Sequence, residues 1–291
     1  MPLKVLFVHD KPDWLLLAIL QECVHLDIEA TVIGAVAYSG FGACREAFTL
    51  DELLERYPPA AERLARFRRC YRHLSVNPEG YERFCYERWF YVHAWLELNQ
   101  ELVVYLDSDY LPLQGFGLDK LPHGAFMDSP FLNVLRSREV FAQFLEYMTE
   151  VFESGEIETF ADRYRHLGQR HVSDMFVLRE FSLANPTSCL FVMNTLIEKG
   201  ICPNVQVSNG HTKSHGWRDI YRHPLTGQYF SQRLDGSLAP FYSLHFQGPA
   251  KKYAPRFLRE STMNTVFQGR TLWDWYRERY GAPPVGLPGA G

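Results

Sequence analysis

The stretch Leu102-Val103-Val104-Tyr105-Leu106-Asp107-Ser108-Asp109 decides how the rest of the chain is interpreted. Its strand-forming residues predict a strand buried on both faces, as in a parallel sheet. Two carboxylates follow directly and would point to the same side if the strand continued through them. Buried anions are costly without a cation, and open α/β sheets bind ligands at the carboxyl ends of their strands. We therefore predict a divalent metal ion carrying a phosphorylated ligand at this end of the strand.

The composition narrows the class of protein. The chain has 291 residues, of which 46% are apolar, enough for the core of one large domain. The formal net charge is -4, which argues against a nucleic-acid-binding protein, because such proteins usually carry a basic excess. The six cysteines include no CxxC pair, so zinc-site spacing is absent and reduced thiols are expected.

The sequence contains no evident targeting or membrane segment. Asp10, Lys11 and Asp13 interrupt the apolar N-terminus before a signal peptide could form. No stretch approaches the roughly 20 apolar residues of a transmembrane helix. We expect a cytoplasmic protein without a transmembrane segment; peripheral membrane association is left open.

Hydrophobic patterning predicts alternating strands and helices. A strand at 3–8, a helix at 14–26 capped by Asp13 and a strand at 28–37 outline a βαβ unit. No GxGxxG or Walker sequence follows the first strand, so the dinucleotide fingerprint is missing. The other predicted helices are 50–73 (broken at Pro58-Pro59), 81–98, 137–152, 160–167, 171–181 and 271–280, and the other predicted strands are 125–128 with 131–135, 203–207 and a hairpin-like excursion within 228–246.

Arginines on two predicted helices need an explanation. Five arginines lie between Arg63 and Arg72, and a solvated helix face is preferred to an anionic partner. Arg83 and Arg88 lie among the apolar residues of the helix at 81–98, which leads into the acidic strand. Each is either a surface residue or a cation on the inner face, within reach of the metal site.

A second motif follows far downstream, in Ser243-Leu244-His245-Phe246-Gln247-Gly248-Pro249-Ala250-Lys251-Lys252. His245 ends a predicted strand and is the best candidate for a third metal ligand. An imidazole is tolerated better by Mn²⁺ than by Mg²⁺, which prefers oxygen ligands. Lys251 follows a glycine-containing turn and could place an ammonium on the same diphosphate. Such a site would stabilise a nucleotide diphosphate as it leaves.

These motifs resemble those of nucleotide-sugar glycosyltransferases with the GT-A fold, and most closely the retaining family 8 typified by glycogenin. Asp107-Ser108-Asp109 resembles the DxD motif of that family, and the stretch from His245 to Lys251 resembles its HFxGxxK motif. Ser173-Asp174-Met175 falls where the family has Gly-Asp-Gln beside the donor sugar.

The resemblance implies a GT-A type, Rossmann-like α/β fold, with a mixed, mainly parallel central sheet flanked by helices in one domain at 1–280. Residues 1–110 would form the nucleotide-binding half, which ends in the DxD motif. Residues 111–280 would form the half that binds the donor sugar and the acceptor. Residues 281–291 are rich in glycine and proline, which predicts a disordered tail.

The resemblance also implies roles for single residues. Asp107, Asp109 and His245 would bind Mn²⁺ or Mg²⁺, and Asp107 would also contact the ribose. The candidate catalytic residues are Asp174, which would contact the sugar, Asp128 and Arg88. The candidate nucleotide and diphosphate contacts are His9, Asp10, Lys11, Asp107, Ser108, Gly248 and Lys251. The chain departs from the family in three places. Met175 replaces its glutamine, and Tyr91 replaces its basic residue on the preceding helix, where Arg88 lies one turn earlier. Lys251-Lys252-Tyr253 replaces its typical Lys-Pro-Trp.

The implied reaction moves a hexose from a UDP-sugar to a hydroxyl of a carbohydrate, a lipid-linked glycan or a protein. Retention is preferred, because the departing phosphate oxygen can then take the acceptor proton. An inverting enzyme would need a base, and Asp128 and Asp174 are the nearest candidates by type. Two other classes are weighed. One is a non-catalytic nucleotide-sugar-binding protein on the same fold; the other is a haloacid-dehalogenase-type phosphohydrolase, whose DxD follows the first strand of its core.

Overall fold

The computed structural model of the chain describes residues 2–11, 13–34, 38, 44–121, 126–127, 131–166, 168, 172–190, 201, 220–232, 235–259 and 261–262. Four predictions lie outside these residues: the strand at 203–207, the helix at 271–280, the tail at 281–291 and the side chain of Asp128.

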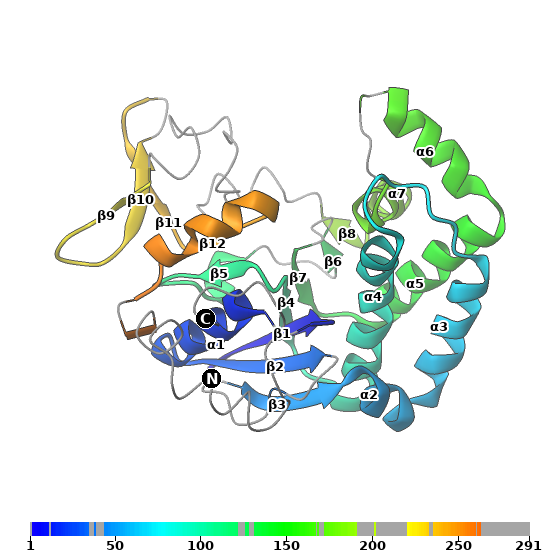
Figure 1. The fold of residues 1–291 in the computed structure, drawn as a ribbon, viewed down its shortest axis with the longest axis horizontal. Helices are drawn as coiled ribbons and strands as arrows, with labels where there is room; N and C mark the ends of the chain where they lie inside the picture. Colours follow the sequence, from blue (N-terminus) through cyan, green and yellow to red (C-terminus); the bar gives the residue numbers. More distant parts are fainter. Residues whose placement is uncertain are drawn as a thin grey trace, which may run out of the picture.

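A five-stranded mixed sheet lies at the centre of the fold (Figure 1). β1 pairs in parallel with β2 and β4, β2 pairs in parallel with β3, and β7 pairs antiparallel with β4. The prediction of an α/β chain with a mixed, mainly parallel sheet is therefore confirmed. In spatial order the strands are β3 (Cys44–Thr49), β2 (Ile28–Gly34), β1 (Leu3–His9), β4 (Val103–Leu106) and β7 (Leu132–Leu135).

Helix α1 (Trp14–His25) covers one face of this sheet. The Asp13 side chain caps the helix as predicted, accepting a hydrogen bond from the Leu15 amide at 2.8 Å. Phe7 and Val32 belong to the apolar cluster that packs against α1. The same cluster includes residues of β5 (Tyr110–Pro112), β12 (Ser243–His245) and the 3₁₀ helix η3 (Gly248–Arg256).

A layer of helices covers the opposite face (Figure 1). Leu6, Ile33 and Tyr105 are strand residues that pack into this second apolar cluster. Its central helix is the long aromatic-rich one predicted at 81–98. The helices of this layer are α2 (Leu50–Arg56), α3 (Pro58–Cys70), α4 (Glu79–Asn99), α5 (Arg138–Glu153), α6 (Glu156–His166) and α7 (Asp174–Ala184).

The remaining elements are short. β6 (Phe126–Met127) pairs in parallel with β8 (Cys189–Leu190), and η1 spans Leu118–Lys120. β9 (Tyr221–Arg222), β10 (Tyr229–Gln232) and β11 (Leu238–Phe241) form a small antiparallel sheet. Within the described part of the chain, no helix has both the length and the apolarity needed to cross a membrane.

Three local predictions differ from the structure. The helix predicted at 81–98 begins two residues earlier, since α4 starts at Glu79 and the Glu82 amide donates to the Pro78 carbonyl at 3.0 Å. β3 was not predicted from the sequence, because its charged residues give no clear apolar pattern. The second arm of the predicted hairpin is divided at Tyr242: β11 pairs with β10, whereas β12 pairs with β5.

The arginines between Arg63 and Arg72 include three that pair with acids of neighbouring helices. Arg66 contacts Glu146 and Glu153, Arg68 contacts Glu87, and Arg72 contacts Glu158. These three arginine side chains are 36%, 49% and 51% exposed. The preferred explanation, a solvated helix face, therefore holds for Arg66 and Arg68, whereas Arg72 is solvated but lies two residues beyond the end of α3.

Acidification is expected to destabilise the fold through His93 on α4. Its ring is 1% exposed and stacks on Phe141. Burial, with help from Arg63 and Arg138, lowers the pKa of His93 from 6.5 to about 4. Glu97 lies 3.4 Å from the ring but is shared with Arg138. The pKa of His93 is lower in the folded than in the unfolded protein. The stability that comes from burying the neutral ring is therefore fully present above pH 6.5. It is lost as the pH falls towards 4, by up to about 3 kcal/mol.

Urea unfolding at pH 7.5 and pH 4.5 tests this expectation. The wild type should lose more unfolding free energy between these two pH values than His93→Phe does, because phenylalanine keeps the ring stacking but has no proton to gain. An equal loss in both proteins would contradict the assignment.

Candidate metal centre

Asp107 and Asp109 lie in a turn after β4 and not in a strand. The turn is closed by the Tyr110 amide, which donates to the Asp107 carbonyl at 3.0 Å. Both aspartates are also tied to neighbouring segments: the Asp107 amide donates to the Phe131 carbonyl, and the Phe246 amide donates to the Asp109 carbonyl, each at 2.9 Å. The side-chain alternation of a continued strand is therefore not what brings the carboxylates together. These backbone hydrogen bonds hold the turn in place.

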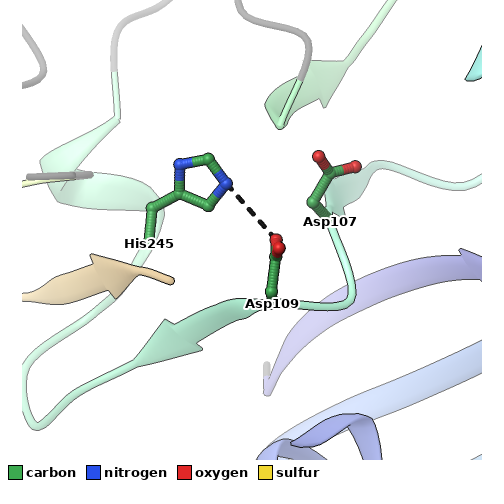
Figure 2. A group of neighbouring side chains, drawn as sticks. All are labelled: Asp107, Asp109 and His245. Atoms are coloured by element: carbon green, nitrogen blue, oxygen red, sulfur yellow. Dashed lines mark ion pairs between the residues drawn. The ribbon is translucent and has the colours of Figure 1, made fainter. Parts of the chain in front are cut away.

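His245 approaches the two aspartates from β12 (Figure 2). It pairs in register with Tyr110, the residue that follows the turn. One ligand atom from each of Asp107, Asp109 and His245 lies within 4.8 Å of the other two. The fold thus assembles the three predicted ligands from segments far apart in the sequence, and the group could hold a metal ion.

The donor set fits a hard divalent cation. Carboxylate oxygens are the preferred ligands of Mg²⁺ and Mn²⁺. Adjacent ligands of an octahedral ion at about 2.1 Å lie about 3 Å apart, close to the 3.3 Å between His245 Nε2 and Asp109 Oδ1. The Asp107 and Asp109 side chains are 22% and 14% exposed, and that of His245 is 4% exposed. The Phe131 ring, 4.6 Å from the imidazole centroid, supports the histidine.

Lys251 places a positive charge beside Asp109. Its Nζ lies 3.4 Å from Asp109 Oδ2 and 3.8 Å from Asp13 Oδ2. Burial alone would lower the pKa of Lys251, but these two carboxylates raise it above its ordinary value. Burial alone would raise the pKa of Asp109, but His245 and Lys251 lower it to about 2. Asp109 is therefore ionised at neutral pH, as a metal ligand must be.

Arg88 of α4 connects Asp107 to Asp174. Its Nη1 donates to Asp107 Oδ1 at 2.5 Å, and its Nη2 donates to Asp174 Oδ2 at 2.7 Å. The Tyr105 hydroxyl donates to the same oxygen of Asp107 at 2.6 Å, and Trp89 Nε1 donates to the same oxygen of Asp174 at 2.8 Å. The Arg88 and Asp174 side chains are 11% and 3% exposed.

The two arginines of α4 thus have different explanations. Arg88 is the inner cation, whereas Arg83 is 45% exposed and pairs with Glu87 on the same helix at 3.2 Å. Burial alone would lower the pKa of Arg88, but Asp107 and Asp174 raise it well above its ordinary value. Burial raises the pKa of Asp107, and Arg88 opposes this rise. Arg88 therefore offsets part of the cost of burying both acids.

Three of the predicted nucleotide contacts, His9, Asp10 and Lys11, lie at the end of β1 or just after it. His9 ends β1, and its Nε2 lies 4.0 Å from Asp13 Oδ2. Burial lowers the pKa of His9, and the charges acting on the ring include those of Lys251 and Asp109. His9 is therefore within electrostatic reach of the candidate metal centre.

Three further predicted contacts have no such link to the centre in the described part of the chain. The Lys11 side chain is exposed, and its carbonyl accepts a hydrogen bond from the Tyr38 hydroxyl at 3.1 Å. Asp10 and Ser108 are half-buried, and the structure gives neither side chain a hydrogen bond to the metal group. Their predicted roles therefore remain predictions.

Gly248 is the first residue of η3, where the chain turns after β12. Its φ of +53° is in the left-handed region that favours glycine. A Cβ placed there would meet nothing within 4 Å, so conformation rather than space requires the glycine. This turn leads the chain into η3, from which Lys251 reaches back to Asp109.

Three residues of the site were missed from the sequence. Tyr105 precedes Asp107 by two positions, so strand alternation could have placed the two side chains together. Asp13 was predicted only as a helix cap. The contact of Trp89 with Asp174 left no signal in the sequence, because it joins two separate helices.

No model of a known protein family matches this chain, and no curated protein sequence matches it either. Function must therefore be argued from the chemistry of the site, since a fold class alone does not imply one.

Proposed function

We propose that the protein is a metal-dependent glycosyltransferase that moves a hexose from a UDP-sugar to an acceptor hydroxyl. The observation that carries this proposal is the convergence of Asp107, Asp109 and His245, with Lys251 Nζ only 3.4 Å from Asp109. Ligands of α/β sheets bind at this edge. A divalent-ion site with an adjacent ammonium matches the charge of a nucleotide diphosphate.

The charged residues would each have a role at the leaving group. Asp107, Asp109 and His245 would hold Mn²⁺ or Mg²⁺. When bound, the ion would supply the positive charge that offsets the charge developing on the diphosphate. Lys251 would contact the same diphosphate once Asp109 has turned from the ammonium to the ion. The half-buried His9 would lie beside the diphosphate or the base.

Arg88 and Asp174 would face the donor sugar. Met175 follows Asp174, is 36% exposed and has no amide to donate or accept hydrogen bonds. Recognition of the sugar hydroxyls at this position would therefore depend on the Asp174 carboxylate. One oxygen of that carboxylate already accepts two hydrogen bonds, one of them from a guanidinium, which reduces its capacity as a base. A retaining reaction, in which the leaving phosphate oxygen takes the acceptor proton, agrees better with this arrangement.

The GT-A type fold is part of the same proposal. It is supported by a mainly parallel sheet whose strand β4 leads into the DxD turn. It is also supported by the small β5–β12 sheet, which brings the HFxGxxK segment to that turn. A cytoplasmic location and a carbohydrate, lipid-linked glycan or protein acceptor are expectations that follow from the proposed activity.

UDP is expected to bind much more tightly with Mn²⁺ than with EDTA. The affinity for UDP should rise at least about tenfold, or about 1.4 kcal/mol, because the ion and Lys251 would both contact the diphosphate. Titration calorimetry measures this difference. A panel of UDP- and GDP-sugars, assayed for Mn²⁺-dependent hydrolysis, would then identify the donor, and NMR of the released sugar would give the anomeric outcome.

Other results would point to other classes. Release of phosphate from simple phosphomonoesters would indicate a phosphohydrolase. Metal-dependent UDP binding without turnover of any nucleotide sugar would indicate a binding protein. UDP affinity that is equal with Mn²⁺ and with EDTA would contradict the proposed site itself.

A further inference from the structure

We propose that Tyr105 and Trp89 are positioning residues that, together with Arg88, fix one oxygen of Asp107 and one of Asp174 and leave the other oxygen of each for a ligand. This inference rests on the proposed function and deepens it. It concerns a group that we call the Arg88 frame, which consists of Arg88, Trp89, Tyr105, Asp107 and Asp174. Four hydrogen bonds hold the frame together, and each of the two acids accepts two of them.

Both hydrogen bonds to Asp107 fall on the same oxygen. Oδ1 accepts from Arg88 at 2.5 Å and from Tyr105 at 2.6 Å. Among the described residues, no hydrogen-bond donor contacts Oδ2. Asp107 therefore has one oxygen held by the protein and one available, and the frame assigns Oδ2 as its metal ligand.

Asp174 repeats this arrangement. Its Oδ2 accepts from Arg88 at 2.7 Å and from Trp89 at 2.8 Å, and no donor in the described part of the chain contacts Oδ1. The side chain is 3% exposed, so a fixed acceptor lies inside the site. A carboxylate oxygen in this state suits a sugar hydroxyl, which can donate a hydrogen bond to it.

Packing prevents the two donors from moving. Trp89 and Tyr105 are both 0% exposed, and their ring centroids are 4.9 Å apart. The Arg88 guanidinium carbon lies 5.1 Å and 5.7 Å from these ring centroids, so cation–π attraction adds to the hydrogen bonds. Phe141 and Phe144 enclose the indole from the helical layer. Side chains locked by packing in this way preorganise a site.

The two donors therefore act on different functions. Among the described residues, the Tyr105 hydroxyl donates to the acid that would bind the metal, whereas the Trp89 indole N–H donates to the acid that would bind the sugar. Removing the tyrosine hydroxyl should affect metal affinity, and removing the indole N–H should affect turnover. This division distinguishes positioning from a general structural role, which would change both together.

Tyr105→Phe removes a single oxygen. We expect its affinity for Mn²⁺, measured by calorimetry or electron paramagnetic resonance without nucleotide, to fall about 10-fold or more, the usual effect of losing a hydrogen bond to a metal ligand. The matched control is Tyr86→Phe on α4, since Tyr86 is 1% exposed and has no hydroxyl hydrogen bond to a described residue. Unchanged Mn²⁺ affinity in folded Tyr105→Phe would overturn the role of Tyr105.

Trp89→Phe keeps an aromatic ring but removes the indole N–H. We expect Mn²⁺ and UDP affinities close to those of the wild type and UDP-sugar hydrolysis reduced about 10- to 100-fold, as for a lost hydrogen bond to a charged group. The control is Trp95→Phe on the same helix, because Trp95 Nε1 is buried without a hydrogen-bond partner among the described residues. Equal hydrolysis by the two variants would overturn the role of Trp89.

Arg88→Lys tests the frame if either aromatic variant fails to fold, as judged by circular dichroism. Lysine keeps the charge but cannot donate to both acids in the planar geometry of a guanidinium. Both Mn²⁺ affinity and hydrolysis should therefore fall, and unchanged values would overturn the frame. A wild-type protein that binds neither Mn²⁺ nor UDP would instead contradict the proposed function, so the two failures are distinguishable.

Discussion

Asp109→Asn is expected to abolish Mn²⁺-dependent UDP binding. Asparagine has nearly the shape of aspartate but no charge, and it leaves His245 and Lys251 facing the site without their shared anion. An incoming cation would then meet a neutral ligand and an uncompensated ammonium. We expect the affinity for Mn²⁺ to fall by more than about 100-fold, above the range typical of changes in residues that only support a metal ligand.

Calorimetric titrations of Mn²⁺, and of UDP with Mn²⁺ and with EDTA, measure this loss. Asp162→Asn is a suitable control, since Asp162 lies on α6, is 69% exposed and pairs with Arg165. If Asp109→Asn bound UDP with the same Mn²⁺ dependence as the wild type, the assignment of the metal centre would be wrong.

Arg88→Met is expected to remove activity and to destabilise the fold by about 3–5 kcal/mol, the range found when one partner of a buried ion pair is deleted. Methionine fills similar space but leaves Asp107 and Asp174 without their common cation. The Asp174 side chain is 3% exposed, so water cannot readily replace the lost hydrogen bond. The loss should therefore be large compared with that of an average point substitution.

Arg83→Met provides a matched comparison on the same helix. Arg83 is 45% exposed, and its partner Glu87 keeps a second cation, Arg68. The loss from Arg83→Met should therefore stay near that of an exposed ion pair, at most about 1 kcal/mol. Urea unfolding in the presence of EDTA compares the two variants without a contribution from bound metal. Similar losses from both substitutions would show that Arg88 does not serve as the shared partner of two buried acids.

Much of the fold could be predicted from local patterns. The apolar runs of β1, β2 and β4 and the cap of α1 lie where the sequence places them. Such elements depend on neighbours along the chain, namely the period of buried side chains and the residue that ends or caps each segment. β3 and the division between β11 and β12 were not predictable in this way, because their pairing partners, and not their own patterns, define them.

The candidate site likewise has features that local sequence patterns predict and features that depend on pairing between distant segments. The sequence by itself determined which residues could bind a metal and a diphosphate, since carboxylates after a buried strand and a lysine after a glycine turn are chemical signals. Only the tertiary structure decided that His245 meets Asp109 across the β5–β12 pair. Only the tertiary structure decided, too, that Arg88 is shared by Asp107 and Asp174. These contacts join residues far apart in the chain, and they form because burying both faces of the sheet forces distant helices and strands to pack together.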